Sequence, residues 1–160
     1  MHPSPYLRPL RWLLIPLLAI VASGTALAAP KPDPALDPAA VVRFQLDAMA
    51  HVDQPVRNAG LATVFGFASP GNRAQTGPLP HFVDLLRKSY PDLLNHRSAI
   101  LEKAVIKGDQ AFQKVELIDR AGHSHRYLFI LSRQRDAPYK GCWMTDGVIN
   151  APDEPGALET

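Results

Sequence analysis

The chain has 160 residues, 46% of them hydrophobic and 20% charged, a length and composition that fit one globular domain. The formal net charge is +2, and residues 30–160 carry 15 basic and 15 acidic side chains. No basic patch interleaved with aromatic residues indicates a nucleic-acid partner, and no acidic tract indicates a solvating tail.

Residues 1–29 have the three-part pattern of a secretory signal peptide. A short basic segment precedes an apolar core over residues 12–22, and small residues then lead to cleavage after Ala28 or Ala29. The alternative is an uncleaved anchor helix, but the apolar core is shorter than a span of about 20 residues and Pro16 interrupts it. We therefore expect export to a periplasm and no stable membrane anchor after cleavage.

Proline-rich segments flank the rest of the chain. Residues 30–37 predict an extended linker, and residues 150–160, which show no apolar period, predict a disordered tail. The domain is therefore expected over residues 38–149.

Three helices are predicted at the start of this domain, over residues 38–52, 55–68 and 81–90. Asp37 suits the N-cap of the first helix and Pro38 suits its first turn. Apolar residues at helical spacing give each segment one face to bury. The second helix is expected to end at Ser69-Pro70-Gly71-Asn72, which predicts a turn.

Four antiparallel strands are predicted after the helices, over residues 98–107, 111–118, 123–133 and 142–149. The turns between them are short, and the Gly108-Asp109 pair is typical of a hairpin turn. In the second strand, Val115 and Leu117 alternate with Lys114 and Glu116, which predicts one buried face. Helices followed by a run of hairpin-linked strands predict the α+β class.

Several stretches of the chain resemble the DUF4864 family of uncharacterised bacterial proteins. They are Val64–Gly71, Phe82 with Tyr90-Pro91, Arg97-Ser98, and Gly141-Cys142-Trp143 with Gly147. The resemblance covers roughly residues 40–149 and implies an NTF2-like or cystatin-like cone, with three helices packed on a curved four-stranded sheet. The family often has Gly-Cys near the end of its last strand, where this chain has Gly147-Val148.

Cones of this kind often enclose a pocket between the helices and the concave sheet. By that analogy, the expected ligand-binding residues are Phe67, Tyr90, Arg97, Tyr127 and Trp143. Relatives of the fold place an acid or base in the pocket, for which the candidates are Asp84 and Asp146 together with the two tyrosines. Core packing of the aromatic residues is the competing interpretation.

Metal and cofactor sites have little support in the sequence, and no cofactor is expected. His123 and His125 would project from the same face of a strand, but two ligands are too few for a metal site. Two solvated histidines are the favoured interpretation. Cys142 has no second cysteine to pair with, so it is either buried or pairs between molecules.

Three functions are compatible with these features. The first is an exported, non-catalytic module that binds a small apolar ligand or a protein partner. The second is a small enzyme of the isomerase or hydratase type with its site in the cone, and the third is a structural homodimer.

Overall fold

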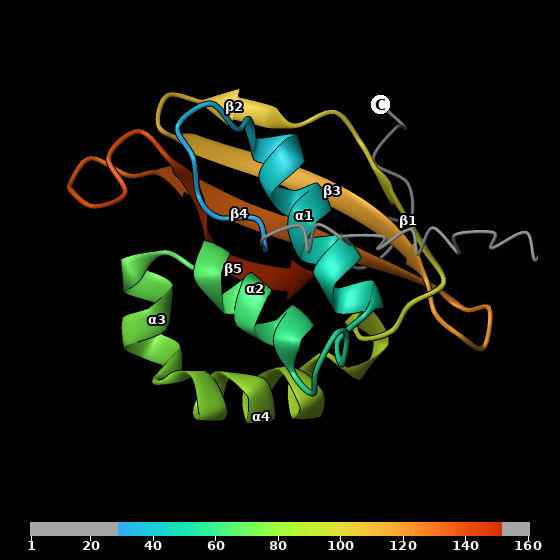
Figure 1. Ribbon diagram of the computed structural model, residues 1–160. Coiled ribbons are helices and arrows are strands. Elements are labelled where there is room, and N and C mark those ends of the chain that lie inside the picture. The colour runs from blue at the N-terminus through green and yellow to red at the C-terminus, as the bar shows by residue number, and fades with distance from the viewer. Residues whose placement is uncertain (1–28, 152–160) are drawn as a thin grey trace, which may run out of the picture.

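The structure, a computed structural model, describes residues 29–151 and has a helical layer packed on one face of an antiparallel sheet (Figure 1). The helices are α1 (Pro38–Ala50), α2 (Ala59–Phe67), α3 (Pro70–Thr76), α4 (Leu79–Ser89) and the 3₁₀ helix η1 (Pro91–Leu93). The strands are β1 (Ser98–Leu101), β2 (Val105–Lys107), β3 (Gln110–Ile118), β4 (Ser124–Arg133) and β5 (Trp143–Asn150). The predicted α+β class is confirmed.

The ends of the chain lie outside this description. Residues 1–28 of the predicted signal peptide and residues 152–160 of the predicted tail are not among the described residues. No helix within residues 29–151 combines the length and the apolar character needed to cross a membrane.

Capping explains where α1 begins. The Asp37 carboxylate accepts a 2.7 Å hydrogen bond from the Ala40 N–H, and Pro38 occupies the first turn, as predicted. The face that α1 turns toward the sheet is apolar except for one glutamine and consists of Val41, Val42, Gln45, Leu46 and Met49.

The prediction of three helices is wrong, because α3 forms where the sequence indicates a turn. Ser69 caps α3 by accepting a 3.2 Å hydrogen bond from the Asn72 N–H, and Pro70 takes the first helical position. A Ser-Pro-Gly-Asn run satisfies the signals for a turn and for a helix start equally well. The predicted second helix also begins later, at Ala59.

The sheet has the order β1-β3-β4-β5, with β2 also paired to β3, and all pairs are antiparallel. The buried and exposed faces of β3 alternate as predicted, because Val115 and Leu117 are buried while Lys114 is exposed. The predicted turn between β2 and β3 also forms, with Gly108 at a φ of 60° as the first of two loop residues.

The prediction of four strands is wrong, because the segment 98–107 is divided into β1 and β2. Leu101 pairs with Val115 whereas Val105 pairs with Phe112, so the first segment carries one more residue than β3 opposite it. An extra residue of this kind is a β-bulge, which bends the strand and interrupts its pairing.

Helices α1 and α2 come into close contact at Gly60. Its N–H donates a 2.9 Å hydrogen bond to the Val52 carbonyl. A Cβ at this position would lie 2.1 Å from the Ala48 carbonyl oxygen, far inside a van der Waals contact. The absence of a side chain therefore lets the two helices pack together and sets the position of α2 against the sheet.

Candidate functional site

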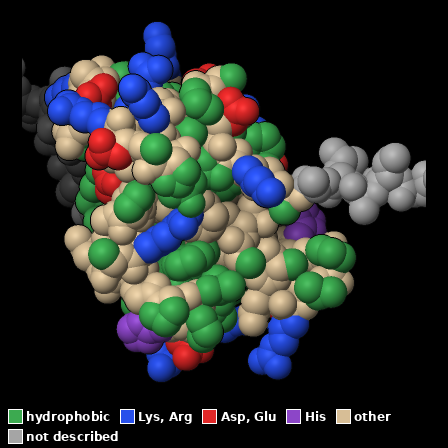
Figure 2. All heavy atoms as spheres, turned by 60° about the vertical axis from the view of Figure 1, so that its left-hand side comes forward, with side chains coloured by type: hydrophobic (Ala, Val, Ile, Leu, Met, Phe, Trp, Pro, Cys, Tyr) green, Lys and Arg blue, Asp and Glu red, His purple; other side chains and the backbone are tan. Residues whose placement is uncertain are grey.

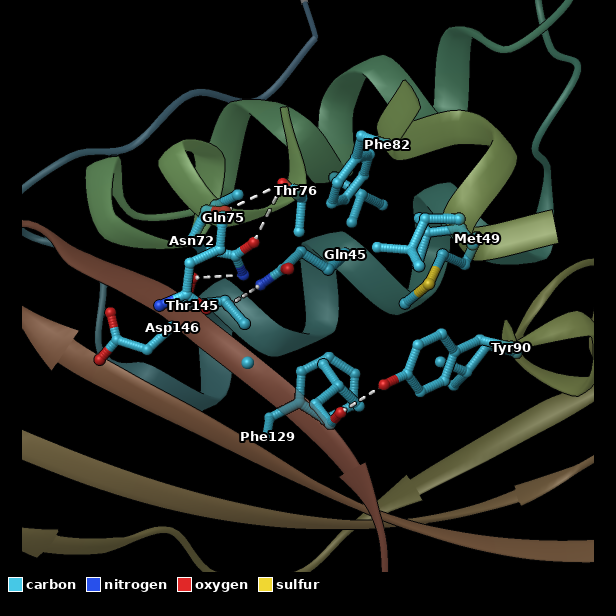
Figure 3. Close-up of a pocket in the computed structure, with 17 residues that line it drawn as sticks. Gln45, Met49, Asn72, Gln75, Thr76, Phe82, Tyr90, Phe129, Thr145 and Asp146 are labelled. Carbon is cyan, nitrogen blue, oxygen red and sulfur yellow. Dashed lines mark hydrogen bonds between the residues drawn. The ribbon is translucent and has the colours of Figure 1, made fainter. Parts of the chain in front are cut away.

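A cavity of about 180 Å³ lies between the helical layer and β5. Its lining residues come from α1, α2, α3, α4, η1, β4 and β5, so segments from Gln45 to Val148 meet around it (Figure 3). The cavity thus depends on the packing of the whole domain rather than on one loop.

Apolar side chains form most of the cavity wall. They are Met49, Val64, Phe82, Leu85, Leu86, Leu93, Phe129 and Val148. Phe82 is held by an edge-on contact with Phe65, whose ring centre is 5.2 Å away. Such a wall favours the binding of apolar groups of a ligand, because removing apolar surface from water is favourable.

Uncharged polar side chains form one end of the cavity. Gln45 donates from Nε2 to the Val41 carbonyl at 3.2 Å and to Thr145 Oγ1 at 2.8 Å. Asn72 donates from Nδ2 to the Thr145 carbonyl at 3.1 Å, and Thr76 Oγ1 donates to the Asn72 carbonyl at 2.9 Å. These bonds tie α1 and α3 to β5 at the polar end.

Strand β5 presents its free edge to the helices instead of to solvent. The Ser69 N–H donates to the Thr145 carbonyl at 2.9 Å, next to a parallel bridge between Ala68 and Thr145. Farther along, the Tyr90 hydroxyl donates to the Val148 carbonyl at 2.8 Å. These contacts satisfy backbone groups of an edge strand and fix the distance between β5 and the helices.

A bulge in β5 determines the position of Asp146. Ile130 pairs with Gly147 while Leu131 pairs with Thr145, which leaves Asp146 as the extra residue. Its carboxylate accepts a 2.9 Å hydrogen bond from Ser132 Oγ. Figure 3 shows this carboxylate turned away from Gln45 and Tyr90, so Asp146 contributes to the cavity rim rather than to its interior.

A family model described as "Domain of unknown function (DUF4864)" matches residues 34–156. The chain belongs to this family. The match includes every described helix and strand, and therefore the whole lining of the cavity. No curated protein and no solved structure matches the chain.

One of the five ligand-binding residues predicted for this DUF4864 domain lines the cavity, namely Tyr90. Phe67 is fully buried in the core, where its ring stacks on Phe44 at 6.1 Å. Trp143 is also part of the core, and Arg97 is exposed at the start of the sheet. Tyr127 is buried below a separate, open depression beside Asn150, and its ring centre is 6.4 Å from that of Tyr90.

The candidate acids have no acid–base partner in the cavity. Asp84 is exposed on α4, lies outside this lining and borders a shallow depression near Val56 instead. Asp146 is the acidic residue of the lining, and among the residues that the structure describes no histidine, lysine or arginine joins it there.

The predicted histidine pair lies at the β3–β4 turn of the DUF4864 domain, next to two aspartates. His125 Nε2 is 2.9 Å from Asp119 Oδ2 and its Nδ1 is 3.6 Å from Asp92 Oδ2, while His123 Nδ1 is 3.3 Å from Asp119 Oδ2. The expectation of two solvated histidines is therefore wrong for His125, which is half-buried. It holds for the exposed ring of His123.

These contacts hold the pKa of Asp119 well below its usual range, first through the hydrogen bond from His125 and then through the backbone N–H of His123. Asp92, Asp119 and His125 each have one ligand atom within 4.8 Å of the others, a donor set that a divalent metal accepts. However, the two ring nitrogens of His125 face different carboxylates, and one ion can bind only one of them. The arrangement is better described as an imidazole held between two carboxylates.

Two further titratable groups are shifted by burial. Burial, with smaller effects from Asp92 and Tyr90, raises the pKa of Tyr127 to about 12. Cys142 is buried, which raises the pKa of its thiol and keeps it in the unreactive protonated form. The structure thus places Cys142 in the first of its two predicted states.

Gln45 is one of the cavity residues that sequence reasoning missed. It occupies the apolar face of α1, between Val41 and Met49, at helical spacing. A buried amide on such a face needs hydrogen-bond partners, so its position alone was a usable signal for a polar interior. Asn72 and Thr76 could not be identified in this way, because α3 itself was not predicted.

Proposed function

We propose that this chain is an exported, non-catalytic domain that binds a small, mainly apolar ligand in a periplasm. The cavity of about 180 Å³ between the helices and β5 is the observation that carries the proposal. Export is supported by the signal-peptide pattern of residues 1–29. Helices packed over one face of an antiparallel sheet, with a cavity between the layers, support an NTF2-like cone as the fold.

The size of the cavity limits the ligand. An apolar cavity of about 150 Å³ holds one benzene molecule, whereas drug-sized ligands occupy pockets of about 300 Å³ or more. A volume of about 180 Å³ therefore fits a single ring or a short branched chain. A steroid-sized substrate would require the helices to move apart.

The alternative of an isomerase or hydratase has less support from the same cavity. General acid–base catalysis needs a group that can exchange a proton with the substrate. The Tyr90 hydroxyl already donates to the Val148 carbonyl, and the Asp146 carboxylate accepts from Ser132 and points away from the interior. The lining is thus suited to holding a molecule rather than to moving its protons.

Native mass spectrometry of the protein purified from a periplasm tests the proposal. The wild-type protein should carry an additional small mass that is lost on unfolding. Leu85→Trp fills the cavity from its half-exposed rim and should abolish this mass. Leu79→Trp, a control on the same helix at a residue outside the lining, should retain it. Wild-type protein without any bound mass would contradict the proposal.

A second candidate function, self-association, is supported by the outer face of the sheet. Ile100, Val105 and Ile149 are 65%, 53% and 50% exposed. Cross-strand pairing places Val105 beside Phe112 and Ile149 beside Leu128, which form the apolar part of this face, whereas Ile100 lies opposite Glu116. Figure 2 shows a different face, where hydrophobic side chains gather among polar atoms and scattered basic residues.

Analytical ultracentrifugation distinguishes this second candidate. If two copies join through the outer face, Val105→Lys should convert a dimer to a monomer, because the charge would be buried in the contact. Val56→Lys is the control, since Val56 is 66% exposed in the α1–α2 connection, away from the sheet. A wild-type protein that is monomeric at high concentration would contradict self-association.

A further inference from the structure

We infer that the ligand is an uncharged molecule of single-ring size whose hydroxyl or N–H group donates a hydrogen bond to Gln45 Oε1. The inference rests on the proposed function, because it specifies the ligand of the same cavity. Three observations support it. The Gln45 amide has a fixed orientation, the described cavity lining has no charged side chain that would pair with an ionic ligand, and the rest of the cavity wall is apolar.

The orientation of the Gln45 amide is fixed by its neighbours. The Val41 carbonyl can only accept a hydrogen bond, so the atom of Gln45 that faces it at 3.2 Å must be the donor, Nε2. The same nitrogen donates to Thr145 Oγ1 at 2.8 Å. A flipped amide would set its oxygen against the Val41 carbonyl oxygen, which is unfavourable. Oε1 is therefore directed away from both partners.

This oxygen is an acceptor inside the domain. Gln45 is 1% exposed and lines the cavity, and Figure 3 shows its oxygen turned away from Thr145. Both side-chain hydrogen bonds of Gln45 use Nε2, and within residues 29–151 Oε1 accepts none. Within residues 29–151 the fully enclosed side-chain oxygen without a partner is Gln113 Oε1, so Gln45 Oε1 remains open to the cavity. A ligand that supplies an O–H or N–H group can therefore replace water at this acceptor and gain the net free energy of one neutral hydrogen bond.

The charges around the cavity exclude an ionic ligand. None of the described lining residues is a lysine, arginine or histidine, so a carboxylate ligand would lose its hydration without a counter-charge. Asp146 could attract a cation, but its carboxylate accepts from Ser132 and points out of the cavity. An uncharged ligand needs no counter-charge in the cavity and gives up no charged-group hydration on binding.

The apolar wall opposite the polar end determines that the rest of the ligand is apolar. Met49, Phe82 and Phe129 face the interior across from the polar end (Figure 3). A ring or branched chain fills that part, while the donor group reaches Gln45. Phenol has this combination of features, and toluene has the same shape without the donor.

Titrations of the wild-type protein, followed by changes in amide NMR shifts, test the inference with phenol, toluene and benzoate. Phenol should bind about two- to tenfold more tightly than toluene, the effect of one added neutral hydrogen bond. Benzoate should bind at least about a hundredfold more weakly than phenol, because of its buried charge. Toluene binding as tightly as phenol, or benzoate binding best, would overturn the inference while leaving the cavity as a binding site. Binding of none of the three would overturn the proposed function as well.

A pair of matched variants assigns the effect to one residue. Gln45→Met keeps the approximate size of the side chain and removes the acceptor, so phenol should lose its advantage over toluene. Gln110→Met changes an exposed glutamine on β3, outside the lining, and should leave the advantage unchanged. Circular dichroism checks that both variants fold. If Gln45→Met does not, the three-probe comparison on the wild-type protein still decides. An unchanged preference for phenol in a folded Gln45→Met protein would contradict the role of Gln45.

Discussion

Gln45 on α1 and Thr145 on β5, 100 positions apart in the chain, are joined by a 2.8 Å hydrogen bond from Nε2 to Oγ1 at the polar end of the cavity. The bond links the first helix to the last strand. Because it holds the amide in place, it also decides which atom of Gln45 faces a ligand.

Thr145→Val should lower the free energy of unfolding by about 1–3 kcal/mol, since it removes the acceptor and leaves a buried N–H of Gln45 without a partner. Thr63→Val is the matched control. Thr63 Oγ1 donates to the Ala59 carbonyl within α2, outside the cavity, so its loss should cost less than about 1 kcal/mol. Urea unfolding measures both values. Equal losses in the two variants would show that the Gln45–Thr145 bond contributes no more to stability than the local bond of Thr63.

Gly60→Ala should destabilise the domain by about 1–3 kcal/mol or more, because the new Cβ would meet the Ala48 carbonyl oxygen at 2.1 Å and push α1 and α2 apart. Gly66→Ala in the same helix has no atom within 4 Å of its Cβ. Its better helix propensity should leave stability unchanged or raise it by up to about 1 kcal/mol. Thermal unfolding of the two variants gives the comparison, and a stable Gly60→Ala protein would contradict the close approach.

Arg73→Lys should destabilise the domain, although the substitution keeps the positive charge. The Arg73 guanidinium lies 5.0 Å from the Phe65 ring centre and 5.4 Å from that of Tyr139, and it donates to the Phe65 and Gly66 carbonyls at the end of α2. A lysine cannot reproduce this planar fork, so we expect a loss of about 1–3 kcal/mol.

Arg87→Lys is the control for that prediction. Arg87 forms a 3.3 Å surface ion pair with Asp53, and its side chain is 38% exposed. Its replacement should change stability by less than about 1 kcal/mol, because solvent screens the pair. If chemical denaturation gave the same loss of stability for both arginine variants, the contacts of Arg73 would not be what holds α2, α3 and the β4–β5 loop together.

Asp119→Asn should make the stability of the domain less dependent on acid. The folded protein lowers the pKa of Asp119. The carboxylate therefore stabilises the fold at pH values above the usual pKa of 3.8, and this stabilisation is lost as the pH falls below that pKa. The wild-type free energy of unfolding should therefore fall more steeply between about pH 5 and pH 2 than that of Asp119→Asn. Asp84→Asn, on the exposed face of α4, should follow the wild-type curve. Parallel curves for all three proteins would contradict the contribution of the His125–Asp119 contact.

Local signals were sufficient for much of the fold. The alternation of Val115 and Leu117 with polar residues placed the buried face of β3, and Asp37-Pro38 placed the start of α1. Ser69-Pro70 failed as a signal because the same residues begin a turn or a helix. The break between β1 and β2 depends on pairing with β3, which no local pattern reveals.

The candidate site was harder to predict because a cavity depends on where packing is incomplete. Aromatic character suggested Phe67, Tyr90 and Trp143 equally, yet two of these are in the core and only Tyr90 meets the cavity. The direction of Asp146 follows from a bulge that appears only once β4 and β5 are paired. Gln45 alone carried a readable signal, as an amide on an apolar helix face.

A crystal structure of the protein with phenol tests the central claim most directly. We predict density for one ring between Phe82 and Phe129, with the hydroxyl oxygen within hydrogen-bond distance of Gln45 Oε1 and the Gln45–Thr145 bond intact. A saturated complex in which phenol lies elsewhere, or in which side chains fill the cavity and no phenol binds, would contradict the account.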